Sequence, residues 1–75
     1  MRTFHQAARR QDAISVFRRN VEEYPKSANV YDSLAEAYMK AGQNDLAIQN
    51  YEMSVQLDPK NQHAADTLKK LKETK

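Results

Sequence analysis

The chain has 75 residues, of which 40% are apolar and 29% charged, and its formal net charge is +2. This is the balance of one small folded domain and excludes a disordered chain. The absence of cysteine excludes disulfides and thiolate metal sites, and it is compatible with the cytoplasmic location that we favour. No apolar run approaches the roughly 20 residues of a membrane helix, so no membrane partner is expected.

The predicted elements are all helical, because apolar residues recur at helical spacing and no segment has the alternation of a strand. In chain order, we expect helices at 2–8, 11–24, 29–41, 44–57 and 61–72. The boundary between the first two is the weakest, since Ala8 does not stop a helix, and the two can run on as one. The fold class is all-α.

Proline, glycine and polar residues mark the helix boundaries. Pro25 and Pro59 follow helix ends, because the residue before a proline resists the α conformation. Gly42 can supply a left-handed C-cap. The predicted N-caps are Ser27 or Asn29 for the third helix, Asn44 or Asp45 for the fourth and Asn61 for the last.

An internal repeat appears when the chain is compared with itself at a shift of 34 residues. The matched pairs are Ala13 with Ala47, Ile14 with Ile48, Phe17 with Tyr51, Val21 with Val55, Pro25 with Pro59 and Leu34 with Leu68. Each copy places an apolar stripe on one helix face, which indicates helices that pack in a repeating way.

Residues 28–61 resemble one tetratricopeptide repeat. The positions that carry the resemblance are Tyr31, Leu34, Ala35, Tyr38, Ala47, Tyr51, Ser54 and Pro59. Residues 1–26 resemble a partial repeat, with Phe4 at its tyrosine position, and residues 62–75 resemble a polar capping helix. The resemblance implies antiparallel helix-turn-helix repeats that form a short right-handed superhelical array, a single domain that binds protein or peptide partners.

The resemblance also implies a peptide groove on the concave face of the array. Its positions fall on Asn29, Asp32, Ser33, Glu36, Lys40, Thr67 and Lys70. Because Asp32 and Glu36 are acidic, they disfavour a partner's terminal carboxylate and favour a basic or neutral peptide. The competing expectation is that so short an array makes a groove too small to bind a peptide well.

A second interaction surface is expected at the start of the chain. Ile14, Phe17 and Val21 belong to a helix whose partner is shortened, so that only Phe4, Ala7 and Ala8 remain to cover one side of it. An uncovered apolar face marks an interaction site, and a two-fold dimer would cover both copies at once. We therefore predict a homodimer joined through residues 1–24, with exchange of the first helices as one form of it.

No enzymatic activity, cofactor or metal is expected, because the chain has no phosphate loop, nucleophile elbow or metal-ligand cluster. Two alternative functions stay open. Residues 24–39 also resemble repeats appended to bacterial serine hydrolases, which would make the chain an accessory segment of a hydrolase. The other alternative is weak nucleic-acid binding. Net charges of +3 in residues 1–26, −4 in 27–59 and +3 in 60–75 do not make the continuous basic face of a nucleic-acid site. The acid-free first eleven residues would also suit a mitochondrial transit peptide.

Overall fold

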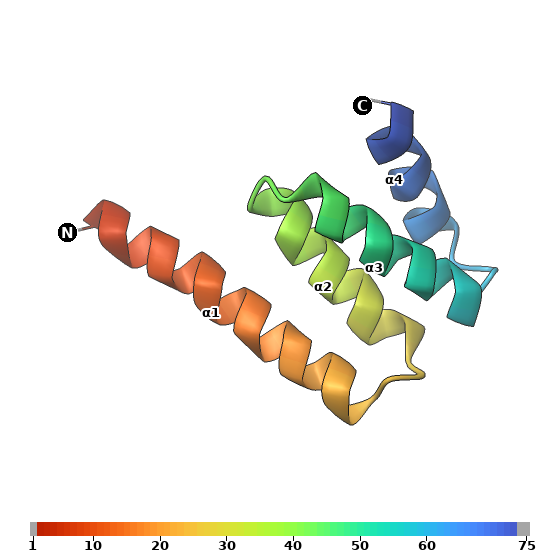
Figure 1. Ribbon diagram of the computed structural model, residues 1–75, viewed down its shortest axis with the longest axis horizontal. Helices are drawn as coiled ribbons and strands as arrows, with labels where there is room; N and C mark the ends of the chain where they lie inside the picture. The colour runs from red at the N-terminus through yellow and green to blue at the C-terminus, as the bar shows by residue number, and fades with distance from the viewer. Residues whose placement is uncertain (1, 74–75) are drawn as a thin grey trace.

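A computed structural model describes residues 2–73, with side chains from residue 13 onward. Within this range it has four helices and no strand: α1 (Arg2–Glu23), α2 (Ala28–Lys40), α3 (Asn44–Leu57) and α4 (Gln62–Glu73). The helices lie next to one another in chain order, and the first part of α1 extends away from the other three (Figure 1). The all-α prediction is confirmed.

Helix α1 is continuous, so the prediction of separate helices at 2–8 and 11–24 is wrong and the run-on alternative is right. The reason lies in a pair of residues 34 positions apart. Gly42 adopts a φ of 82°, which glycine reaches without the penalty that a Cβ brings, and there the chain reverses between α2 and α3. The equivalent residue is Ala8, the strongest helix former, so the helix runs through it.

The end of α2 is a Schellman motif, as the predicted role of Gly42 requires. The Gln43 N–H donates to the Tyr38 carbonyl at 2.9 Å, and the Gly42 N–H donates to the Met39 carbonyl at 3.1 Å. This turn places Gln43 at the N-cap of α3, so the prediction that Asn44 or Asp45 occupies that position is wrong.

The other two cap predictions have different outcomes. Asn61 caps α4, since its Oδ1 accepts a hydrogen bond from the Ala64 N–H at 3.2 Å. Ser27 holds the N-cap position of α2 but makes no capping hydrogen bond with its side chain, and Asn29 lies inside the helix. The predicted N-cap position of Ser27 is therefore confirmed, but its side chain makes no capping hydrogen bond.

The core lies between α2, α3 and α4. Its buried residues are Leu34, Ala35, Tyr38, Ala47, Tyr51, Ser54, Ala64 and Leu71. Three of them are alanines, whose small side chains let neighbouring helices approach closely. Among the described side chains of α1, residues 13–23, none is fully buried, and this difference between α1 and α3 defines the candidate site.

Candidate protein-interaction surfaces

The internal repeat allows α1 to be compared with α3 residue by residue. Ala47, Tyr51 and Ser54 of α3 are 0% exposed. Their equivalents in α1, Ala13, Phe17 and Asn20, are only half-buried. Helix α3 packs closely against both α2 and α4, whereas the close packing found for the described part of α1 is with α2. One side of α1 therefore lacks the covering helix that the same side of α3 has.

The uncovered side, which we name the α1 stripe, consists of Ala13, Val16, Phe17 and Asn20. These positions follow the i, i+3, i+4, i+7 spacing of one helix face. Val16 is 53% exposed, a large fraction for a valine. The matching face of α3 meets α2, as the hydrogen bond from Ser54 Oγ to the Ala28 carbonyl at 3.1 Å shows.

A groove of about 230 Å³ runs between the α1 stripe and α2. Its lining consists of Ala13, Phe17, Ser33, Glu36, Ala37 and Lys40, and we name it the α1–α2 groove. The equivalents of Ala13, Phe17 and Ala37, 34 positions later in the chain, are Ala47, Tyr51 and Leu71. All three equivalents are buried in the core. The groove is thus the place where a further helix would complete the packing.

The residues predicted for self-association divide into two groups. Ile14, Phe17 and Val21 are half-buried and pack against the core. Phe4, Ala7 and Ala8 lie on the first part of α1, and their side chains are outside those that the structure describes. Of the first group, only Phe17 lines the α1–α2 groove.

Sequence reasoning missed Val16. The signal that could have found it is its equivalent in the other copy, Asn50, because a valine replaces a polar residue there. The Asn50 side chain donates from Nδ2 to the Leu46 carbonyl at 2.8 Å and so is satisfied within its own helix. Valine cannot make such a hydrogen bond, and Val16 stays exposed beside the half-buried Phe17.

The predicted peptide-groove residues are not brought together in one place. Ser33, Glu36 and Lys40 line the α1–α2 groove, while Thr67 and Lys70 lie on α4 outside it. Asn29 is exposed at the start of α2. Asp32 accepts a hydrogen bond at Oδ2 from Asn61 Nδ2 at 3.4 Å. A peptide groove along these seven positions stays a prediction.

Tyr51 lies beneath this acidic part of α2. Among the described residues its buried hydroxyl has no hydrogen-bond partner. Burial, followed by the carboxylates of Asp32 and Glu36, raises the pKa of Tyr51 from 10.0 to about 12. The tyrosine therefore stays neutral at ordinary pH, and the two acids give this face of α2 a negative potential.

The far end of the array carries a second groove, of about 340 Å³. Val55, Ala65, Leu68, Lys69, Lys72 and Glu73 line it. Lys72 is paired with Glu52 at 3.1 Å. Lys69 and Lys72 stand where α2 has Ala35 and Tyr38, the buried residues of its packing with α3. Lysines at these positions oppose the packing of another helix in the way that α3 packs on α2.

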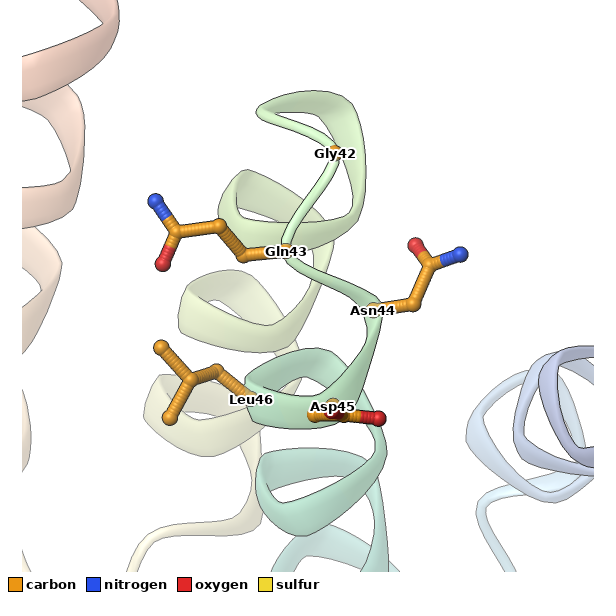
Figure 2. Close-up of a pocket in the computed structure, with 5 residues that line it drawn as sticks. All are labelled: Gly42, Gln43, Asn44, Asp45 and Leu46. Atoms are coloured by element: carbon orange, nitrogen blue, oxygen red, sulfur yellow. The ribbon is translucent and has the colours of Figure 1, made fainter. Parts of the chain in front are cut away.

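Another hollow, of about 450 Å³, lies at the turn between α2 and α3. Figure 2 shows that the side chains of Gln43 and Asn44 point to opposite sides of the chain there. Because its polar groups do not converge on one point, this hollow does not have the form of a ligand site.

Two further observations concern the described part of the chain. Among residues 13–73, whose side chains the structure describes, no three side chains of the metal-binding types are grouped closely enough to hold an ion. Of the helices described, none combines the length and the hydropathy that crossing a bilayer requires.

The antiparallel pair α2–α3, repeated in part by α1 before it and α4 after it, defines a helical-repeat protein. The family model of the tetratricopeptide repeat matches residues 28–61. This segment is a tetratricopeptide repeat, as the sequence resemblance indicated, and repeats of this kind mediate protein–protein interactions. No curated protein matches the chain.

Proposed function

We propose that this chain is a protein-interaction module that associates with a second copy of itself through α1. One observation carries the proposal. The face of α3 that contains Ala47, Tyr51 and Ser54 is 0% exposed at these residues, whereas the equivalent face of α1 is only half-buried. The proposal gives the chain no chemistry of its own.

The physical argument is that a domain of this size gains much from covering that face. Small domains bury a low fraction of their surface and are marginally stable when alone. Two copies related by a two-fold axis would each cover the other's α1 stripe. The straight α1 supports exchange of its first part, because that part extends away from its own α2, α3 and α4 (Figure 1).

A second interaction is proposed along α2. The carboxylates of Asp32 and Glu36 favour a basic or neutral peptide there over a terminal carboxylate. A synthetic lysine-containing peptide should shift backbone amide resonances of α2 more strongly than its glutamate counterpart. Equal shifts would contradict this second proposal.

The main proposal is tested with one exposed residue on each helix. Val16→Asp places a charge in the α1 stripe, whereas Met53→Asp does so on α3, where Met53 is 38% exposed. In size-exclusion chromatography with light scattering, we expect twice the 8.7 kDa chain mass for the unmodified protein and for Met53→Asp. We expect the single-chain mass for Val16→Asp, because burying an unpaired carboxylate is costly. Equal masses for the two variants would count against the α1 stripe.

A further inference from the structure

The groove at the far end of the array, which we name the α3–α4 groove, has a counterpart inside the molecule. Its lining residues are Val55, Ala65, Leu68, Lys69, Lys72 and Glu73. The residues 34 positions earlier are Val21, Tyr31, Leu34, Ala35, Tyr38 and Met39. In this earlier copy all six are buried or half-buried, and α3 is the helix that packs closely against α2 there. The structure thus shows what covers such a surface, namely an amphipathic helix that packs as α3 does.

The floor of the α3–α4 groove keeps the apolar character of its counterpart. Val55 and Leu68 take the places of Val21 and Leu34. Both pack against the core, yet both remain half-buried because no further helix lies over them. The apolar face of a helix would therefore find apolar contacts in this groove.

The middle of the groove carries a cation in place of a small residue. Lys69 stands at the position that is 0% exposed on α2. Among the described residues Lys69 makes no ion pair, whereas Lys72 is paired with Glu52 at 3.1 Å. Glu73 follows Lys69 by four positions, the less favourable order of charges for a pair on one helix. Asp66 accepts a hydrogen bond from a glutamine of its own helix. A helix that covers the groove therefore meets one ammonium group without a counterion.

A second copy of this chain does not supply that counterion. Helix α1 is the equivalent of α3, but it has Ala13 where α3 has the fully buried Ala47. The acids of α1 are Asp12, Glu22 and Glu23, and they correspond to Leu46, Gln56 and Leu57. These three residues of α3 are all exposed, so none of the acids lies on the face that would cover the groove. With α1 in the groove the Lys69 ammonium would be buried without a partner, which is costly.

We infer that the α3–α4 groove binds an amphipathic helix of a different protein, whose apolar face carries an aspartate or glutamate opposite Lys69. The apolar side chains of that helix contact Val55 and Leu68, and its carboxylate pairs with the Lys69 ammonium. The inference goes beyond self-association through α1 and does not depend on it, because α1 and α4 lie at opposite ends of the array (Figure 1).

The sequence of α3 supplies a probe for this groove. A synthetic peptide of residues 44–57 with Ala47→Glu combines the apolar face of α3 with a carboxylate at a position that is fully buried on α3. The same change keeps the peptide from replacing α3 in its own place, since a carboxylate would be buried there among apolar residues. Short isolated helices are marginal in water, so weak binding is expected. NMR titration of the isotope-labelled full chain measures it.

We expect the Ala47→Glu peptide to shift amide resonances of α4 around Lys69. It should bind about tenfold more tightly than the unmodified peptide, because its carboxylate pairs with the ammonium group. Lys69→Glu in the chain should abolish this preference, and an Ala47→Lys peptide should recover affinity for that variant. Lys70→Glu is the matched control, since Lys70 is an exposed neighbour that does not line the groove. It should change the affinity by less than about twofold.

Three results would overturn the inference. The first is the absence of shifts in α4 at millimolar concentrations of the Ala47→Glu peptide, and the second is equal affinity for the two peptides. The third is an equal loss in Lys69→Glu and Lys70→Glu, which would show a general attraction to the lysines of α4 instead of docking in the groove. The mass of the unmodified chain tests the proposed function separately.

Discussion

At the scale of single residues, Tyr51 shows that the two copies of the repeat carry different aromatic residues at one equivalent position. Its hydroxyl is buried and, among the described residues, has no hydrogen-bond partner, whereas Phe17 holds the equivalent position in α1 without a hydroxyl. A buried unpaired polar group costs about 1–3 kcal/mol. The tyrosine ring is retained for packing, and its hydroxyl contributes nothing visible to stability.

Tyr51→Phe should therefore leave the free energy of unfolding unchanged or raise it by about 1 kcal/mol. Tyr31→Phe is the matched control, because the Tyr31 hydroxyl donates to the Pro25 carbonyl at 2.8 Å and its loss should lower stability by about 0.5–1.5 kcal/mol. Urea denaturation followed by circular dichroism measures both. A loss of more than about 1 kcal/mol in Tyr51→Phe would show that its hydroxyl has a stabilising role.

The raised pKa of Tyr51 predicts an alkaline limit to stability. Burial and the nearby carboxylates favour the neutral phenol in the folded state, with a pKa of about 12 against 10.0. The corresponding stability is present below pH 10 and is lost as the pH rises from about 10 to about 12. Between these values, Tyr51→Phe should lose less stability than the unmodified chain. Identical pH dependence of the two proteins would contradict the assignment.

At the scale of helices, Asn61 joins three elements. Its Oδ1 caps α4, and its Nδ2 donates to Ser54 Oγ at 3.2 Å and to Asp32 Oδ2 at 3.4 Å. Asn61→Ala should lower the free energy of unfolding by about 1–2 kcal/mol, because both the cap and the links to α2 and α3 are removed. Gln43→Ala is the control, since Gln43 holds the N-cap position of α3 without a side-chain hydrogen bond. Equal losses in the two variants would contradict this role of Asn61.

The helices α2, α3 and α4 could be predicted from the sequence almost to the residue, because Pro25, Gly42 and Pro59 interrupt helices for simple steric reasons. The continuity of α1 could not be predicted, since it depended on whether Ala8 lies in a turn or in a helix. The N-cap residue of α3 was also beyond prediction, whereas Ser27 takes its predicted N-cap position in α2. Several polar residues precede each helix, and the geometry of the preceding turn decides which one takes the N-cap position.

The interaction surface could be predicted only in part, because its exposed residues depend on how the helices pack. The apolar pattern of α1 identified Ile14, Phe17 and Val21, but periodicity alone does not say which side of the helix α2 covers. The structure places Ile14 and Val21 against the core, and it leaves Val16 exposed. Which residues remain for a partner is thus a property of packing, which only the structure shows.

At the scale of the whole molecule, the two ends of the array differ. The outer side of α4 carries lysines at the positions where a further helix would pack, whereas α1 presents Ala13, Val16 and Phe17 around a groove. Terminal elements of repeat arrays need a polar outer face to remain soluble. Because α4 meets that need and α1 does not, we expect self-association at α1 rather than at α4.

Sedimentation equilibrium of the unmodified chain over a wide range of concentrations tests this central claim most directly. We expect a mass that rises with concentration to a plateau at twice the 8.7 kDa of one chain and goes no higher. A folded chain that stays at 8.7 kDa at every concentration would contradict self-association. A mass that continues to rise would contradict the closed pair.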